Sequence, residues 1–335
     1  MRRLLIFCSF FLVAILVVVF GLISELQRPY YNAGEDETFI YIPTGANAAK
    51  VAALLKEQGI LHMQLPFRLW LRYNGLDRSL KAGEYRFSGG ATPAQVAERL
   101  TRGDIYFRSI TIPEGLTAME TVELLARGGF GESEKLEAAL LRTDWIQDLN
   151  PSAQNLEGYL FPETYRFGRS NEEESVIRAM VDQFRERMNK IKKESPSPDG
   201  WTVPRIVTLA SLIEKEVKDP SEQAIVASVL VNRLRLNMPL GCDATIIYAM
   251  KLAGTWDGNI RRSDLRMESP YNSYIHRDLP PGPICNPGES AIRAALNPEK
   301  TDFLYYVSKN DGTHQFSKDL RSHNEAVNHY QRSGR

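Results

Sequence analysis

Two glutamates, Glu214 and Glu216, lie inside an otherwise apolar run with helical periodicity, and their type and spacing suit acid–base chemistry. A carboxylic acid held against apolar surface has a raised pKa and can act as a general acid at neutral pH. The alternative is that both side chains only solvate a helix face, as most glutamates do. The run therefore predicts either a catalytic acid or an ordinary exposed helix.

The helical period separates the two glutamates. At about 100° per residue, the apolar side chains of residues 206–217 fill one broad arc of the predicted helix. Glu216 falls inside this arc, between Leu209 and Leu212, where a purely solvating carboxylate is not expected. Glu214 falls just outside it, and we expect that residue to be solvated; the alternative is a hydrogen bond near the helix through which Glu214 tunes its neighbour. Periodicity favours Glu216, although it does not show whether the arc faces a core or a cleft.

Further motifs follow one another along the chain and extend this pattern. They are L-E-G-Y-L-F-P-E-T-Y at 156–165, P-Y-N-S-Y at 270–274, D-L-P-P-G-P-I at 278–284, Y-Y-V at 305–307 and H-Q-F at 314–316. Together with the Glu214-Lys-Glu216 triplet, this series resembles the endolytic murein transglycosylases, the MltG or YceG-like family. The resemblance runs from about residue 40 to the C-terminus. Asp278, where the family has glycine, is a minor departure.

The resemblance implies a catalytic role for Glu216, because the second glutamate of this triplet is the essential residue of the family. Glycosidic bond cleavage needs an acid to protonate the leaving oxygen. A lytic transglycosylase uses the same glutamate again as a base on the C6 hydroxyl of muramic acid. That hydroxyl closes on C1 and leaves a 1,6-anhydro end without consuming water. The implied substrate is the peptidoglycan glycan strand, cut internally while nascent, with peptidoglycan polymerases as candidate partners.

Five other polar residues are candidates for substrate binding. Asp243, Asn272 and Tyr274 have groups that can orient a sugar or stabilise developing charge through hydrogen bonds. Glu157 and Glu163 belong to the 156–165 motif. Each residue also has a structural alternative: an Asx-turn for Asp243 and Asn272, a half-buried aromatic for Tyr274, and a structural role in the turn for the two glutamates.

The composition argues against several other classes of protein. The 41 basic and 41 acidic residues balance, so nothing indicates a nucleic-acid partner. The five histidines show no ligand spacing typical of a metal site, and we expect neither metal nor cofactor. Cys242 and Cys285 would lie in an oxidising compartment if they are exported, so a disulfide and two free thiols both remain open.

An uncharged run rich in Leu, Val, Ile and Phe spans Leu4–Ser24, long enough to cross ~30 Å of hydrocarbon as a helix. Arg2 and Arg3 precede it and acidic residues follow, so the positive-inside rule puts the N-terminus in the cytoplasm. A cleaved signal peptide is the rival interpretation, but no A-x-A-like cleavage site follows the run. We expect a single-pass protein of the bacterial inner membrane with its remaining mass in the periplasm.

The rest of the chain predicts an α+β protein with a weak internal repeat. A short strand, a glycine turn and an amphipathic helix recur after residues 42, 87 and 112. Such units are similar to LysM glycan-binding modules, as the family resemblance also implies, although ordinary packing units would show the same pattern. We expect an anchor at 1–27, a LysM-like module at 38–108, and a catalytic domain at 109–335 with a helical core and a proline-rich, loop-rich last third.

More local elements are expected as well. They are a helix at 61–73, a strand at 82–87, a surface loop at 195–200, a strand at 303–307 and a terminal helix at 324–332. Two functional alternatives also stay open: a non-catalytic wall-binding scaffold of the wall-synthesis machinery, and a lysozyme-like hydrolase that would leave reducing ends. Mass spectrometry of digested murein distinguishes all three by their products.

Overall fold

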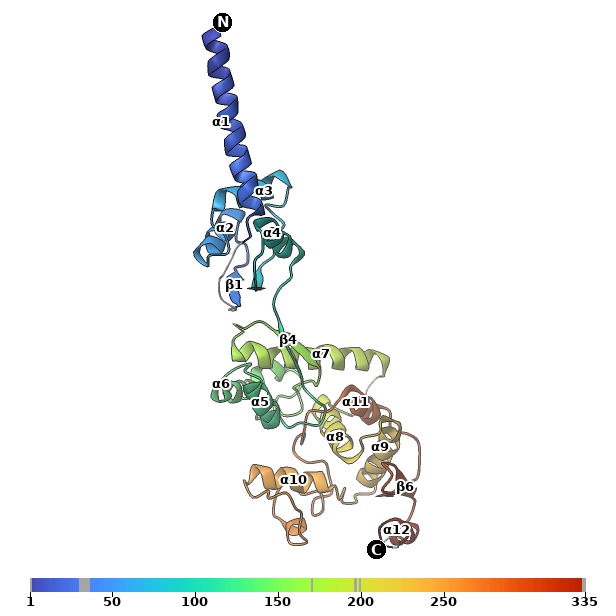
Figure 1. The fold of residues 1–335 in the computed structure, drawn as a ribbon. Helices are drawn as coiled ribbons and strands as arrows, with labels where there is room; N and C mark the ends of the chain where they lie inside the picture. The colour runs from blue at the N-terminus through green and yellow to red at the C-terminus, as the bar shows by residue number, and fades with distance from the viewer. Residues whose placement is uncertain (1, 30–36, 170, 196–197, 199, 333–335) are drawn as a thin grey trace. The chain divides into compact units, whose positions relative to one another are not determined.

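The computed structural model describes residues 2–29, 37–169, 171–195, 198 and 200–332 (Figure 1). Residues Met1–Arg108 with Arg166–Ser170 form one compact unit, and Ser109–Tyr165 with Asn171–Arg335 form a second. The first unit contains α1 (Arg2–Gln27), β1 (Thr38–Ile42), α2 (Ala48–Glu57), α3 (Gln64–Tyr73), β2 (Gly83–Phe87) and α4 (Pro93–Arg102). A separate two-stranded sheet pairs β3 (Arg108–Thr111) with β4 (Thr164–Phe167).

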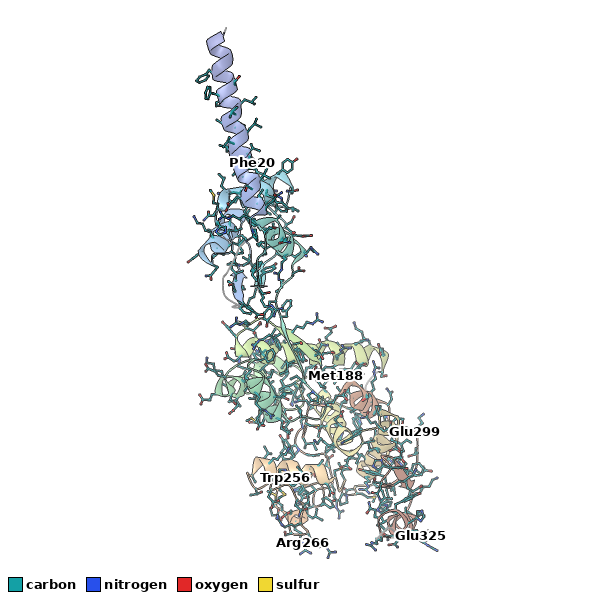
Figure 2. The ribbon with its side chains drawn as sticks, in the orientation of Figure 1. Phe20, Met188, Trp256, Arg266, Glu299 and Glu325 are labelled. Atoms are coloured by element: carbon teal, nitrogen blue, oxygen red, sulfur yellow. The ribbon has the colours of Figure 1, made fainter. Side chains whose placement is uncertain are left out.

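The N-terminal uncharged run is helical, as predicted. Among the described residues, α1 is the one helix long and apolar enough to cross a membrane, over Ser9–Gln27. Its described apolar side chains in the middle of the helix are exposed, Phe20 among them (Figure 2). An apolar helix whose side chains find no protein core is suited to a lipid environment.

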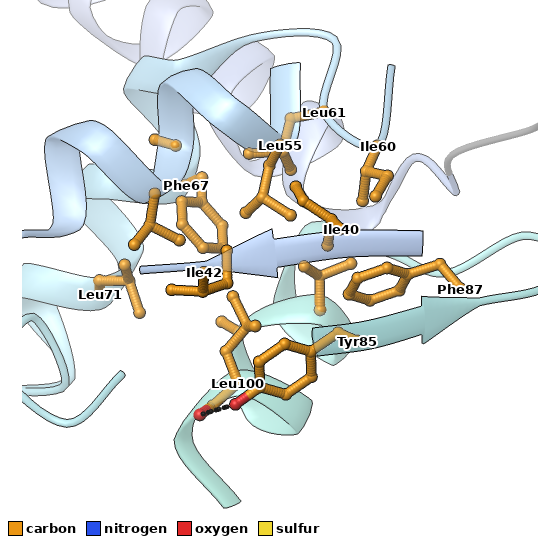
Figure 3. Packing of buried hydrophobic residues seen from close by; sticks show 14 residues of the cluster. Ile40, Ile42, Leu55, Ile60, Leu61, Phe67, Leu71, Tyr85, Phe87 and Leu100 are labelled. Atoms are coloured by element: carbon orange, nitrogen blue, oxygen red, sulfur yellow. Dashed lines mark hydrogen bonds between the residues drawn. The ribbon is translucent and has the colours of Figure 1, made fainter. Parts of the chain in front are cut away.

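The core of the first unit lies between the β1–β2 sheet and its helices. The two strands are antiparallel, with Ile40 opposite Tyr85. Figure 3 shows aliphatic and aromatic side chains from both strands and from α2, α3 and α4 meeting in one cluster. The buried Tyr85 hydroxyl is satisfied by the carbonyl of Leu100, 3.3 Å away, and by that of Lys81. The cluster contains no α1 residue, so the small unit has a core of its own.

The three predicted strand–turn–helix repeats are all present, as β1 with α2, β2 with α4, and β3 with α5 (Ala118–Arg127). The helices of the second and third repeats, α4 and α5, begin with full capping boxes, formed by Thr92 with Gln95 and by Thr117 with Glu120. In each box a hydroxyl and a side-chain carbonyl or carboxylate oxygen accept hydrogen bonds from free backbone N–H groups, which fixes where the helix starts. The helix predicted at 61–73 begins at Gln64, and the strand predicted at 82–87 is β2.

The second unit is mainly helical. It contains α5 (Ala118–Arg127), α6 (Ser133–Ala139), η1 (Thr143–Ile146), α7 (Glu173–Glu194), α8 (Val203–Glu216), α9 (Pro220–Arg235), α10 (Asp243–Leu252), η2 (Asp264–Arg266), α11 (Glu289–Leu296), β5 (Tyr305–Ser308), β6 (His314–Ser317), α12 (Leu320–Val327) and η3 (Asn328–Arg332). Helix α8 packs against α9, α10 and α11 (Figure 1). The long helix α7 buries one stripe that includes Phe184 and Met188. The observed mixture of helices and strands agrees with the predicted α+β class.

The predicted irregular last third is confirmed between α10 and α11, where η2 is the one helix among residues 253–288. The expected strand at 303–307 starts two residues later, as β5, and pairs antiparallel with β6. The terminal helix starts earlier than expected, at Leu320. Three residues of the loop predicted at 195–200, namely 196, 197 and 199, lie outside the described residues.

Candidate active site

Glu216 is the last residue of α8, and local sequence explains why the helix ends there. Pro204 stands in the first turn of α8, where a missing N–H costs nothing. Directly beyond Glu216 the chain turns to start α9, with Asp219 as N-cap accepting from the Ser221 N–H and Pro220 in the first turn. Proline disfavours helical geometry in the residue before it, so α8 cannot continue into α9. The carboxyl group of Glu216, the predicted catalytic acid, therefore sits at a helix C-terminus.

The surroundings of Glu216 favour its protonated form. Burial raises the pKa of this carboxyl above its usual range, and the nearby Asp243 carboxylate raises it further. The partial negative charge of a helix C-terminus acts in the same direction. Tyr306 and Cys242 stabilise the carboxylate and so lower the pKa of Glu216, but the net pKa stays raised. The result is an acid that keeps its proton at a higher pH than an ordinary glutamate, with donors ready for the charged form.

Tyr306 reaches Glu216 from strand β5. Its hydroxyl donates to Glu216 Oε2 at 2.8 Å. Within the β5–β6 sheet Tyr306 stands opposite Phe316, and its ring makes an edge contact with His314. His314 is in turn held by Glu222 of α9, which accepts from the His314 backbone N–H and bonds to its Nδ1 at 2.7 Å. The β5–β6 hairpin thus places the Tyr306 hydroxyl and the His314 ring near the end of α8.

Asp243 and Tyr274, two predicted substrate-binding residues, lie beside Glu216. Asp243 is the first residue of α10 and remains exposed, and the Tyr274 hydroxyl donates to its Oδ1 at 2.5 Å. The position of α10 is fixed at its start, since the Cys242 N–H donates to Ser273 Oγ at 2.9 Å. A second carboxylate and a phenol therefore accompany the acid, although their role in binding substrate stays a prediction.

Asn272 is fully buried, and its side chain organises the loop. Its amide nitrogen donates to the carbonyls of Leu265 and Met267, and its Oδ1 accepts from the Tyr274 N–H. Such an arrangement is typical of an Asx-turn, the structural alternative for this residue. Asn272 therefore holds the backbone of Tyr274, and substrate binding by Asn272 stays a prediction.

Glu214 departs from the expected solvated position, and that expectation is wrong. The side chain is half-buried, and its Oε2 accepts from the Gly288 N–H at 3.0 Å, at the start of α11. Burial raises the pKa of this carboxyl, and the Glu114 charge adds to the effect. The helical wheel could not foresee this contact, because Gly288 comes from a distant part of the chain. Glu214 joins α8 to α11.

Glu157 lines a large cavity and does not contact Glu216. The side chain is buried, and its two oxygens accept from the Ala118 N–H and, at 3.3 Å, from the Tyr248 hydroxyl. Burial raises its pKa to about 8. The cavity, of about 780 Å³, is lined by residues of α5, α6 and α10, and Glu216 is not among them. Like Glu216, Glu157 is an acid with a raised pKa and hydrogen-bond donors on its carboxylate. The preference for Glu216 therefore rests on its place in the Glu214-Lys-Glu216 triplet and on the exposed Asp243 beside it, and substrate binding by Glu157 stays a prediction.

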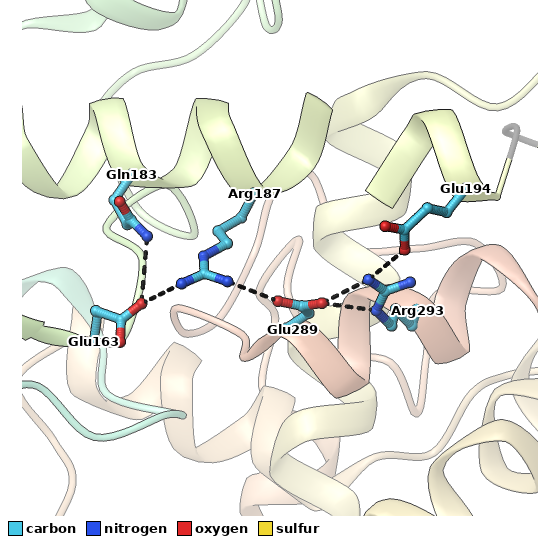
Figure 4. A network of polar contacts seen from close by, with 6 residues as sticks. All are labelled: Glu163, Gln183, Arg187, Glu194, Glu289 and Arg293. Atoms are coloured by element: carbon cyan, nitrogen blue, oxygen red, sulfur yellow. Dashed lines mark hydrogen bonds and ion pairs between the residues drawn. The ribbon is translucent and has the colours of Figure 1, made fainter. Parts of the chain in front are cut away.

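Glu163 belongs to a network of ion pairs between helices (Figure 4). It accepts from Arg187 of α7 at 2.8 Å, Arg187 also contacts Glu289, and Glu289 pairs with Arg293 of α11. Arg293 continues to Glu194 at the end of α7. These contacts connect α7 with α11, so the observed role of Glu163 is structural, and substrate binding by it stays a prediction.

Cys242 and Cys285 are free and buried, which decides the question that the sequence left open. The Cys242 thiol donates to the Leu240 carbonyl at 3.8 Å and also lies beside Glu216, whose pKa it lowers, while burial raises the pKa of the thiol itself. Cys285 donates to the Ser211 carbonyl at 3.4 Å. Within the described part of the chain, no group of three or more His, Cys, Asp or Glu side chains is placed to hold a metal ion.

Three residues of the site were not predicted as such from the sequence: Tyr306, His314 and Cys242. The motifs at 305–307 and 314–316 were visible, but nothing in their spacing shows that a hairpin faces the end of α8. A strand alternates its side chains between two faces, and only the partner element decides which face is functional. Cys242 drew attention as a possible disulfide partner.

The fold and the site define a class: a mixed α+β protein with one acid of raised pKa at a helix end, served by a tyrosine, a thiol and a nearby aspartate. The family model described as the YceG-like family matches residues 40–329. The chain belongs to the YceG-like family.

Individual relatives agree with this assignment. An endolytic murein transglycosylase of Bacillus subtilis (strain 168) is 32% identical over 323 residues, covering 92% of this chain and 88% of the relative. An endolytic murein transglycosylase of Streptococcus pneumoniae (strain ATCC BAA-255 / R6) is 28% identical over 85% of this chain, which spans 57% of that protein. The crystal structure of a putative yceG-like protein from Listeria monocytogenes matches with 29% identity and a TM-score of 0.57, covering 88% of this chain and 100% of that one.

Proposed function

We propose that the chain is a membrane-anchored endolytic lytic transglycosylase of nascent peptidoglycan. The observation that carries the proposal is Glu216, a half-buried acid with a raised pKa and two hydrogen-bond donors on its carboxylate. The activity in the names of the relatives from Bacillus subtilis and Streptococcus pneumoniae supports it. The bond cleaved is that between MurNAc and GlcNAc, and the product carries a 1,6-anhydro-MurNAc end.

The reaction uses Glu216 twice. Protonated Glu216 gives its proton to the glycosidic oxygen, the C1–O bond breaks with its electron pair on that oxygen, and C1 gains oxocarbenium character. The resulting carboxylate is stabilised by Tyr306 and Cys242. It then takes the proton of the C6 hydroxyl, whose oxygen bonds to C1. Glu216 ends protonated, so acid and base are regenerated within one turnover.

The test is a digest of purified glycan strands, with products identified by mass spectrometry. The wild-type protein yields anhydro-MurNAc ends, and Glu216→Gln yields none because the amide cannot give up a proton as an acid. Glu214→Gln is the matched control and retains cleavage, since its expected defect is in the contact to Gly288. Near-normal cleavage by Glu216→Gln together with loss in Glu214→Gln would reverse the assignment.

A hydrolase is the second candidate, and one observation favours it. Asp243 lies close enough to Glu216 to raise its pKa, and a hydrolase needs a second carboxylate to activate water or attack the sugar. Against this, the Asp243 carboxylate is already engaged by Tyr274. Reducing ends in the digest, lost in Asp243→Asn, would establish hydrolysis in place of transglycosylation.

The anchor, the small unit and the placement in the cell complete the proposal. Helix α1 crosses the inner membrane once with its N-terminus in the cytoplasm, and residues 38–108 act as a LysM-like module that holds the glycan. An enzyme fixed beside the bilayer reaches newly made strands near their polymerases. A reporter active only outside the cytoplasm, fused after Arg335, tests the topology. Cells carrying Glu216→Gln should have longer glycan strands, whereas unchanged strand lengths with loss of terminal disaccharide release would show exolytic action.

A further inference from the structure

An apolar groove of about 640 Å³ separates the C-terminal end of α1 from α3. One wall is formed by Val19, Leu22 and Ile23 of α1, and the other by Leu69 and Trp70 of α3, among others. All of these residues belong to the first compact unit. None of them is part of the buried core cluster of that unit, although Trp70 packs against it. The groove therefore lies on the surface of the unit, outside the core that stabilises its fold.

Helix α3 has two apolar faces. Phe67 and Leu71 are 0% exposed and point into the core (Figure 3). Leu65, Leu69 and Tyr73 follow one another at four-residue spacing on the opposite side, where they are 53%, 45% and 91% exposed. Four-residue spacing keeps side chains on one stripe of a helix. A soluble helix rarely leaves such a stripe uncovered, so it indicates an apolar partner.

The apolar stretch of α1 fixes what surrounds this stripe. The uncharged run Leu4–Ser24 has about the length that spans ~30 Å of hydrocarbon. With the run centred in a bilayer, Ser24 lies at the boundary with the outer headgroups, and Val19 lies roughly 7 Å deeper. Since Val19 and Ile23 form one wall of the groove, the groove opens at the boundary of hydrocarbon and headgroups.

The charges of α3 match that position. The helix contains Arg68 and Arg72, both exposed, and no acidic residue. Among the described residues, neither arginine takes part in an ion pair. Trp70 and Tyr73 are the amphipathic aromatic residues that concentrate at membrane interfaces. Basic and aromatic side chains around an apolar groove complement a lipid that has a negative headgroup.

We propose that the groove between α1 and α3 binds an anionic phospholipid of the outer leaflet. An acyl chain lies against Leu69 and Trp70, and the headgroup phosphate lies beside Arg68 and Arg72. Helix α3 is then a second membrane contact that holds the small unit at the bilayer surface. This inference rests on the membrane anchor of the proposed function.

The test uses the full chain in lipid nanodiscs, with one fluorophore on an introduced cysteine in a Cys8→Ser background. Cys242 and Cys285 are fully buried and free, so they do not compete for the label. The labelled positions are Leu69→Cys and Tyr73→Cys on the stripe, Glu57→Cys on α2 as an exposed control, and Val13→Cys in α1. Phospholipids with a nitroxide near the top of the acyl chain serve as quenchers for the stripe and the α2 control, and phospholipids with a nitroxide near the end of the chain serve for Val13, which lies at the middle of the apolar run.

We expect both stripe positions to be quenched at least threefold more strongly than the α2 control. Quenching at Val13 without stronger quenching on the stripe would overturn the lipid groove and leave the anchor intact; a partner's transmembrane helix filling the groove gives this pattern. No quenching at Val13 would overturn the anchor, and the groove proposal with it.

Lipid charge is tested with nitroxide on phosphatidylglycerol compared with phosphatidylcholine. A basic side chain near an anionic surface contributes about fivefold to partitioning, so Arg68→Gln/Arg72→Gln should lower the preference for the anionic quencher by roughly 25-fold. Lys50→Gln/Lys56→Gln on α2 removes the same charge from exposed positions of the same unit. Equal effects of the two double variants would refute a specific headgroup site at α3.

Discussion

Replacing Tyr306 with phenylalanine removes one hydroxyl from the site and changes little else. That hydroxyl donates to Glu216 Oε2 at 2.8 Å and stabilises the carboxylate. The protonated carboxyl gains less from the same contact. Burial raises the pKa of Glu216, and the tyrosine partly offsets the rise. In Tyr306→Phe the opposing contribution is gone, so the pKa of Glu216 must rise further.

The size of the change follows from the energy of one hydrogen bond to a charged group. Such a bond contributes about 1.5–3 kcal/mol. At 1.36 kcal/mol per pKa unit, its loss raises the pKa of Glu216 by roughly 1–2 units. The free enzyme needs Glu216 protonated to act as an acid, so kcat/KM falls as the pH rises through this pKa. The alkaline limb of the profile should therefore move to higher pH by roughly 1–2 units.

The assay is the pH dependence of kcat/KM for release of anhydro-MurNAc ends from purified strands. Tyr305→Phe is the matched control, because the neighbouring ring stacks on His323 and its hydroxyl makes no hydrogen bond to Glu216. Its alkaline limb should coincide with that of the wild type. An unchanged limb in Tyr306→Phe, or one displaced to lower pH, would refute the reasoning about Glu216. The maximal rate should also fall, since the developing carboxylate loses a donor.

Two further predictions concern stability. The folded-state pKa of Glu157 is raised from 4.5 to about 8. Protonated Glu157 therefore contributes at most roughly 5 kcal/mol to the free energy of unfolding; this contribution is complete below pH 4.5 and is lost as the pH rises to about 8. The Tm of Glu157→Gln relative to the wild type should therefore increase across this pH range in calorimetry, while exposed Glu123→Gln shows no such trend. Gly158 has φ +84°, and an added Cβ would lie 2.4 Å from Pro283 Cγ, so Gly158→Ala should destabilise the protein by about 2–4 kcal/mol in urea unfolding. Gly254→Ala is the control at φ +67° with open space around it, and its cost should be near 1 kcal/mol; equal losses would contradict the steric argument.

Periodicity and local chemistry determined much of this protein. The uncharged run predicted α1, the apolar period predicted the helix that carries Glu216, and Asp219-Pro220 marked the boundary between α8 and α9. These features depend on residues within one or two turns of each other. Steric limits at proline, the 3.6-residue period and the length of an apolar run act locally, so they can be read from the sequence.

Contacts between distant segments were decided by the tertiary structure. Glu157 and Glu163 stand in one short motif, yet the first lines a cavity with Tyr248 and the second pairs with Arg187. Glu214, expected in solvent, accepts from Gly288. Tyr306 is separated from Glu216 by 90 residues, and only the packing of strand β5 against α9 brings its hydroxyl to the Glu216 carboxyl. A helix or strand pattern fixes the faces of an element, but the energy of burying those faces against other elements selects which residues meet.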